Sequence, residues 1–188
     1  MPRVALITGA SRGIGAATAR VLAERGFRVV VNHRASGPQA KEVVADITAA
    51  GGEAIAIQAD VTVPGDISAM ADGIAQRWGG VDVLVHNALI PFVVTSFADL
   101  TWEQFGGKLD RELHAAYSLT KAVVPEMVSR GFGRLCGPRL YLPVFGPEFR
   151  HLLGPSAHRT GHRQGALPAG YRRRSNRGQL RRLMDCRP

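Results

Sequence analysis

The chain has 188 residues, of which 45% are hydrophobic, and a formal net charge of +9. This length predicts a single domain with a real core, and no apolar run approaches the roughly 18 residues that a membrane span needs. No signal-peptide pattern precedes the first apolar run, so we expect a cytoplasmic protein. Cys136 and Cys186 have neither metal-site spacing nor the pattern of a disulfide framework.

Basic residues are distributed unevenly along the chain. Residues 1–135 contain thirteen Lys or Arg and thirteen Asp or Glu, so this part is neutral. Residues 136–188 contain eleven Arg, no Lys and two acidic residues, which accounts for the whole net charge of +9. We therefore divide the chain into a domain over residues 1–135 and a tail, rich in Arg, Pro and Gly, over residues 136–188.

The first stretch of the chain predicts a phosphate-binding turn. A short apolar run over residues 4–7 is typical of a buried strand, and a helix pattern begins at about Ala16. Gly9, Gly13 and Gly15 lie between them, where the missing Cβ atoms let the backbone approach a pyrophosphate. The first N–H groups of a helix and its macrodipole favour that negative charge. An ordinary tight strand–helix turn is the alternative.

Strand and helix patterns alternate through residue 86. Apolar runs over 28–32, 53–58 and 81–86 predict strands, and helical periodicity predicts helices over 38–50 and 64–78. This alternation implies right-handed crossovers and a parallel sheet with helices on both faces. The sequence therefore predicts an α/β fold with a doubly wound, Rossmann-like sheet of order 3-2-1-4, which binds ligands beyond its C-terminal strand ends.

The residues after the second strand indicate which cofactor binds. NAD-preferring sites place an acidic residue there, on the ribose 2′-hydroxyl, whereas this chain has Asn32-His33-Arg34. Arg34, with Arg12 in the glycine turn, could instead pair with a 2′-phosphate through bidentate hydrogen bonds. We therefore predict NADP, with NAD as the alternative, unless both arginines are solvated surface charges.

The spacing Thr-Gly-x-x-x-Gly-x-Gly over residues 8–15 resembles that of the short-chain dehydrogenase/reductase family, whose members reduce carbonyls or oxidise alcohols with NAD(H) or NADP(H). Residues 86–89, His-Asn-Ala-Leu, are similar to the family's Asn-Asn-Ala-Gly motif. In the family the pair matching Asp60 and Val61 contacts the adenine; a generic Asp before a helix is the alternative. The predicted cofactor-binding residues are Gly9, Ser11, Arg12, Gly13, Ile14, Gly15, Arg34, Asp60, Val61, Asn87 and Ala88.

His86 is interpreted as a buried histidine at the end of the fourth strand, rather than as a general base.

The long helix after this strand, and the residues that follow the helix, extend the resemblance to about Leu135. Thr101 fits a capping box with Gln104 at the start of a long helix. In the family this helix forms an oligomer interface and carries an Asn that holds a proton-relay water, but Glu112 occupies the matching position here, so that role is not carried over. A fifth strand is expected to begin after this helix.

The family's catalytic residues are not recognised after that point. In the family a Ser ends the fifth strand, and a later helix presents Tyr-x-x-x-Lys, whose Lys lowers the pKa of the Tyr that transfers the proton. Here no Ser-Ser strand end and no lysine follow Leu135. Tyr117 and Lys121 have the right spacing but precede the fifth strand. We therefore interpret Tyr117 as a packing aromatic and leave the catalytic residues unknown.

The tail has no sustained apolar periodicity, so we expect it to be irregular or disordered. Its abrupt start in the middle of a motif favours a reading-frame shift in a GC-rich gene. A nucleic-acid or membrane-surface arm around the three arginines at 172–174 is an alternative. His158 and His162 are four residues apart, but they lack acidic neighbours, so we expect no metal site.

The whole sequence predicts a short-chain oxidoreductase that uses NADP(H) on a small-molecule carbonyl or alcohol. Because its catalytic half is not recognised, we expect cofactor binding with impaired or no turnover. The alternative is a non-catalytic dinucleotide- or nucleic-acid-binding protein that uses the basic tail. The family usually forms homodimers or homotetramers, but the sequence does not determine the oligomeric state of this chain. The sheet would be incomplete, with its last strand at an open edge, and we expect poor solubility for that reason.

Overall fold

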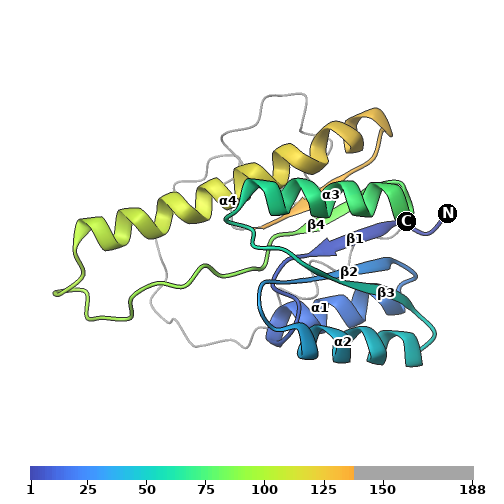
Figure 1. Cartoon of the computed structure of the whole chain (residues 1–188), viewed down its shortest axis with the longest axis horizontal. Helices are drawn as coiled ribbons and strands as arrows, with labels where there is room; N and C mark the ends of the chain where they lie inside the picture. Colours follow the sequence, from blue (N-terminus) through green and yellow to red (C-terminus); the bar gives the residue numbers. More distant parts are fainter. Residues whose placement is uncertain (138–188) are drawn as a thin grey trace, which may run out of the picture. The chain divides into compact units, whose positions relative to one another are not determined.

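The structure, a computed structural model, describes residues 1–137, and the predictions made for residues 138–188 lie outside this range. Strands and helices alternate along the described chain (Figure 1). In chain order they are β1 (Val4–Ile7), α1 (Gly13–Glu24), β2 (Arg28–His33), α2 (Gly37–Ala49), β3 (Glu53–Gln58), α3 (Pro64–Trp78), β4 (Val83–Val85), α4 (Trp102–Ser129) and β5 (Arg134–Cys136). The strands form one parallel sheet of order β3-β2-β1-β4-β5. The predicted fold and strand order are confirmed, with the fifth strand placed beside β4.

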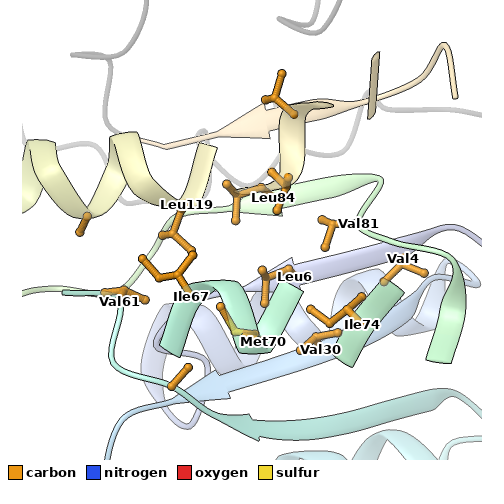
Figure 2. Packing of buried hydrophobic residues seen from close by; sticks show 14 of the residues in the cluster. Val4, Leu6, Val30, Val61, Ile67, Met70, Ile74, Val81, Leu84 and Leu119 are labelled. Carbon is orange, nitrogen blue, oxygen red and sulfur yellow. The ribbon is translucent and has the colours of Figure 1, made fainter. Parts of the chain in front are cut away.

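Successive side chains of the strands pack on opposite faces of the sheet, as the period of two requires. Leu6 belongs to the cluster between the sheet and helices α3 and α4, whereas its neighbour Ile7 belongs to the cluster on the face covered by α1 and α2. Figure 2 shows the first cluster, in which Leu6 lies among Met70, Ile74 and Leu119. Burying a side chain of this size contributes about 1.5–3 kcal/mol.

The helix boundaries follow local chemistry. Helices α2 and α3 both have a proline in their first turn, where its missing N–H is harmless. The predicted capping box opens α4, because the Thr101 hydroxyl accepts from the Gln104 N–H at 3.2 Å and the Gln104 side chain accepts from the Thr101 N–H at 3.1 Å. Helix α3 ends at Gly79, whose φ of 80° is left-handed.

Strand β4 is shorter than the predicted run over 81–86. Only Val83–Val85 pair as a strand. Single backbone hydrogen bonds continue on either side, from Asp82 N–H to the Val4 carbonyl at 2.9 Å and from His86 N–H to the Cys136 carbonyl at 2.7 Å. The Asp82 carboxylate accepts the Val4 N–H at 2.8 Å, so a side chain replaces a strand partner there.

Helix α4 has 28 residues, and its two halves have different surroundings. Its buried residues begin at Ala115 and continue to Met127. Trp102, Phe105 and Leu113, in the first half, are exposed. Neither α4 nor any other helix within residues 1–137 combines the length and apolar character of a membrane span.

Candidate dinucleotide-binding site

A cleft of about 460 Å³ lies beyond the C-terminal ends of β1, β2, β3 and β4. The strand order reverses between β1 and β4, and doubly wound sheets bind their ligands at that point. The volume is within the range of cofactor sites. Predicted site residues that line the cleft are Gly9, Ser11, Arg12, Arg34, Asp60, Val61, Asn87 and Ala88; Gly13, Ile14 and Gly15 lie outside its lining.

The three glycines of the first turn have different roles. A Cβ on Gly9 would come within 2.8 Å of the Ala88 Cα, and one on Gly15 within 2.5 Å of the Asn87 Nδ2. Both positions need glycine because the turn packs against the segment after β4. Gly13 has a φ of 59°, and nothing in the described chain lies within 4 Å of a Cβ built there. Glycine is therefore favoured at position 13 by its left-handed φ and not by close packing.

Helix α1 presents its N-terminus to this turn. Its N-cap residue is Arg12, which has an extended backbone and makes no side-chain capping hydrogen bond, and the first turn holds no acidic residue. The first N–H groups of a helix need partners, and the macrodipole favours an anion there. Ser11 is buried and lines the same edge of the cleft. This helix end is suited to a phosphate group.

Buried polar groups tie β1 to the segment after β4. The Thr8 hydroxyl oxygen accepts from the N–H groups of Asn87 and Ala88, at 3.0 Å in each case. The Asn87 side chain donates to the carbonyls of Thr8 and Gly9, at 3.0 and 3.2 Å. Four hydrogen bonds therefore hold the two predicted site residues, Asn87 and Ala88, against the glycine turn.

Asn32 joins three strand ends, a role that the sequence analysis missed. It is 1% exposed, accepts from the Gly9 N–H at 3.3 Å and donates to the Ala59 carbonyl at 3.0 Å. An Asn at the end of a buried apolar run was the available signal, since a buried amide needs hydrogen-bond partners.

Arg34 lies exposed at the cleft beside Asp60. Its side chain is 57% exposed, and its Nη1 is 3.9 Å from Oδ2 of Asp60. The Asp60 Oδ1 accepts from the N–H and hydroxyl of Thr62, at 2.9 and 2.7 Å, whereas the N-cap of α3 is Val63. Burial raises the pKa of Asp60, but the hydrogen bonds from Thr62 and the charge of Arg34 outweigh it, so the pKa lies below its usual value. The carboxylate is therefore ionised at neutral pH.

His33 provides a test of whether the cleft fits a polar ligand. It is buried, it lines the cleft, and its Nδ1 has no hydrogen-bond partner among residues 1–137. Burial and the charge of Lys41 both lower the pKa of His33, so the ring is neutral at neutral pH. Buried polar atoms normally have a hydrogen-bond partner. The Nδ1 atom of His33 therefore suits a cleft that binds a ligand with polar groups.

His86 is a buried strand-end histidine, as predicted. It is 8% exposed, and its Nε2 lies 3.9 Å from Oε2 of Glu112 on α4. Burial lowers the pKa of His86, and Glu112 opposes this only in part. The ring is therefore neutral at neutral pH, and it lies outside the residues that line the cleft.

The expectation that Tyr117 packs as an aromatic is wrong. Its ring is 53% exposed, because Tyr117 lies on the face of α4 that turns away from the core residues Ala116 and Leu119. Its described ring contact is with Lys121, whose Nζ is 5.7 Å from the ring centroid. Both residues lie outside the residues that line the cleft.

No group of three or more His, Cys, Asp or Glu within residues 1–137 is arranged to hold a metal ion. His158, His162 and the arginines at 172–174 lie outside the described residues. The domain boundary near residue 135, the frame shift and the nucleic-acid arm stay predictions from the sequence.

The chain matches the family model of the short chain dehydrogenases over residues 3–136. It is 32% identical over 136 residues to the D-beta-hydroxybutyrate dehydrogenase of Rhizobium meliloti (strain 1021), covering 72% of this chain and 52% of that protein. It is 41% identical over 133 residues to a 3-oxoacyl-(acyl-carrier-protein) reductase of Synechocystis sp., covering 71% and 53%. The chain belongs to the short-chain dehydrogenase family, and it spans about half the length of these relatives.

Solved structures with the same fold include two cofactor complexes. A metagenomic short-chain oxidoreductase in complex with NADP superposes with a TM-score of 0.65 at 36% identity, over 72% of this chain and 61% of that one. An actinorhodin polyketide ketoreductase with NADPH superposes with a TM-score of 0.65 at 34% identity, over 72% and 52%. The family resemblance inferred from the glycine spacing is confirmed.

Proposed function

We propose that this chain binds NADP(H) in the cleft, as part of an oxidoreductase site for a small-molecule carbonyl or alcohol. The observation that carries the proposal is the exposed Arg34 at the cleft, after a β2 end that lacks an acidic residue. A guanidinium matches a phosphate through bidentate hydrogen bonds, whereas an acid would select the ribose 2′-hydroxyl of NAD. The similar oxidoreductase and ketoreductase were solved with NADP and NADPH, which supports this choice.

Each part of the cleft suits one part of the dinucleotide. The part of the glycine turn that lines the cleft, from Gly9 to Arg12, and the N-terminus of α1 would hold the pyrophosphate. Arg34, together with Arg12, would hold the 2′-phosphate, and Asp60 with Val61 would contact the adenine. When bound, NADP(H) supplies or accepts the hydride of the reaction.

The nicotinamide half would extend across the other side of the glycine turn. Because the adenine side of the cleft lies at β2 and β3, the dinucleotide has to pass over β1 toward the end of β4. Asn87 and Ala88 line the cleft there, and their N–H groups donate to the Thr8 hydroxyl oxygen. These residues would orient the reactive ring.

The proton-transfer residues are not assigned within residues 1–137. No lysine follows Lys121 in the sequence, so the family's Tyr-x-x-x-Lys is missing from its usual place. We propose that Tyr117 and Lys121 are not a catalytic pair, and that the chain binds the cofactor with impaired or no turnover. The position of both side chains outside the cleft supports this.

Calorimetric titration of the purified chain with NADPH and NADH tests the proposal. We expect tighter binding of NADPH, and we expect Arg34→Leu to reduce that preference by roughly 10- to 100-fold, as for loss of a hydrogen bond to a charged group. Arg77→Leu, on α3 and away from the cleft, serves as the charge-matched control. An unchanged NADPH-to-NADH ratio in Arg34→Leu would refute the assignment of the 2′-phosphate site. Loss of the nicotinamide absorbance with a panel of carbonyls would show that turnover is retained.

A homo-oligomer of the family type is also proposed. Helix α4 exposes the large side chains of Trp102, Phe105, Leu113 and Tyr117, and exposed apolar surface is typical of protein interfaces. Light scattering coupled to size-exclusion chromatography tests this, and a monomer at all concentrations would contradict it. A cytoplasmic location stays a prediction from the sequence.

A further inference from the structure

The segment that follows β4 is held from two sides. On the β1 side, Thr8 binds Asn87 and Ala88. On the α4 side, the backbone N–H and carbonyl of Ile90 both form hydrogen bonds with side chains of α4. Its N–H donates to Oε1 of Glu112 at 3.0 Å, and its carbonyl accepts from Nζ of Lys108. Both backbone groups of one residue are therefore fixed by α4.

The two side chains that hold Ile90 also bind each other. Lys108 and Glu112 are one helical turn apart and form an ion pair with their side chains only 17% and 22% exposed. Most exposed pairs contribute little to stability, because water competes with them and their geometry varies. This pair is sheltered, and each charged group has a defined backbone partner, so it specifies the position of the Ile90 backbone.

His86 and Phe92 complete the surroundings of the pair. The His86 Nε2 lies 3.9 Å from Oε2, the second carboxylate oxygen of Glu112. The Lys108 Nζ lies 5.2 Å from the centroid of the Phe92 ring. The pair is therefore surrounded by residues of the same segment after β4, before and after Ile90.

This segment is a wall of the cleft. Leu89, Ile90 and Pro91 line the cleft beyond Asn87 and Ala88. The Ile90 side chain is 5% exposed and belongs to the core cluster under α3 and α4, so it cannot move freely. None of the α4 residues before Ala115 is buried, so core packing does not hold this half of the helix. The polar pair therefore connects it to the wall.

We propose that Lys108 and Glu112 are positioning residues, which fix the β4-side wall of the cleft by holding both polar groups of Ile90. The inference rests on the proposed dinucleotide binding. It assigns the pair to the half of the ligand that extends past Asn87, and not to the adenosine half near Arg34.

Paired titrations of the full chain test this assignment. The ligands are NADPH and 2′,5′-ADP, which carries the 2′-phosphate and adenine but no nicotinamide. We expect Glu112→Ala and Lys108→Met to weaken NADPH binding roughly tenfold, because each removes a charge-assisted hydrogen bond to the wall. Binding of 2′,5′-ADP should change less than twofold. Glu112→Gln keeps an acceptor for the Ile90 N–H and should restore part of the NADPH affinity.

Asp110→Ala is the matched control, because Asp110 is an exposed acid on the same helix. It should change neither affinity. A merely structural role of the pair would lower the melting temperature without changing the ratio of the two affinities. An unchanged ratio in both Glu112→Ala and Lys108→Met, or wild-type binding of 2′,5′-ADP as tight as that of NADPH, would overturn the inference while dinucleotide binding stands. If the wild-type chain binds neither ligand, the proposed function fails and the inference fails with it.

Discussion

The strands that lie on either side of β1 in the sheet, β2 and β3 on one side and β4 and β5 on the other, are held together differently. On one side, β1, β2 and β3 pair over four and six residues and are joined through α1 and α2 by tight turns. On the other side, β4 pairs over only three residues with β1 and with β5, and a long segment separates it from α4. The β2–β3 side therefore depends on regular strand pairing. The β4 side has a short ladder and needs other contacts.

Those other contacts are long-range packing and polar bridges. Asp82 accepts from the Val4 N–H and pairs with Arg130 at 3.0 Å, and Arg130 donates to the Val81 carbonyl at 2.7 Å. Lys108 and Glu112 add the contact with Ile90. We therefore expect a single side-chain change to damage the β4 side of the sheet more easily than the β2–β3 side.

The largest expected effect comes from removing packing between the sheet and α4. Leu119 is 1% exposed, and Leu119→Ala should lower the free energy of unfolding by about 2–5 kcal/mol, because it leaves a cavity. Leu113→Ala, on the exposed half of the same helix, should change it by less than about 0.5 kcal/mol. Chemical denaturation measures both. Equal losses would contradict the division of α4 into a packed and an exposed half.

The next largest effect tests the contact between the two sides. Gly15→Ala places a Cβ within 2.5 Å of the Asn87 side chain, so it should lower the free energy of unfolding by about 1–3 kcal/mol and weaken NADPH binding. Gly73→Ala is the control, because that glycine is in α3 with open space around it, and the change should stabilise by up to about 1 kcal/mol. Thermal melting with and without NADPH distinguishes them. A Gly15→Ala chain as stable as the wild type would show that the two sides do not touch closely.

A smaller effect is expected from acidification. The pKa of His86 lies below the ordinary value of 6.5, so the unfolded chain takes up a proton before the folded chain does. The free energy of unfolding should therefore be unaffected by this group above pH 6.5 and should fall as the pH drops below it. His33, at the end of β2, contributes in the same direction. His86→Asn should reduce the pH dependence of the free energy of unfolding, which denaturation curves at several pH values measure. An unchanged pH dependence in this variant would contradict the role given to His86.

The smallest effect is expected at Tyr117. Tyr117→Phe should change NADPH affinity and any residual turnover by less than about twofold, since a catalytic hydroxyl would cost at least a hundredfold. Steady-state assays and titration measure both. A hundredfold loss of turnover with unchanged cofactor affinity would instead identify Tyr117 as the proton donor.

The sequence by itself determined the order of strands and helices, the glycine turn and eight of the residues that line the cleft. These features depend on short-range rules, because apolar runs, helix caps and glycine spacing act within a few residues of the chain. For this reason the predicted bounds of β3 and α3 agree with the structure, Glu53–Gln58 and Pro64–Trp78.

Only the tertiary structure decided which polar side chains hold the site together. Asn32 binds Ala59, Asn87 binds Thr8, and Glu112 binds Ile90, contacts that join residues 27, 79 and 22 positions apart. The exposure of Tyr117 was also decided by the tertiary structure, because α4 turns this side chain away from the face that packs on the sheet. Such contacts depend on how elements far apart in the sequence pack together. Local sequence patterns do not determine that packing.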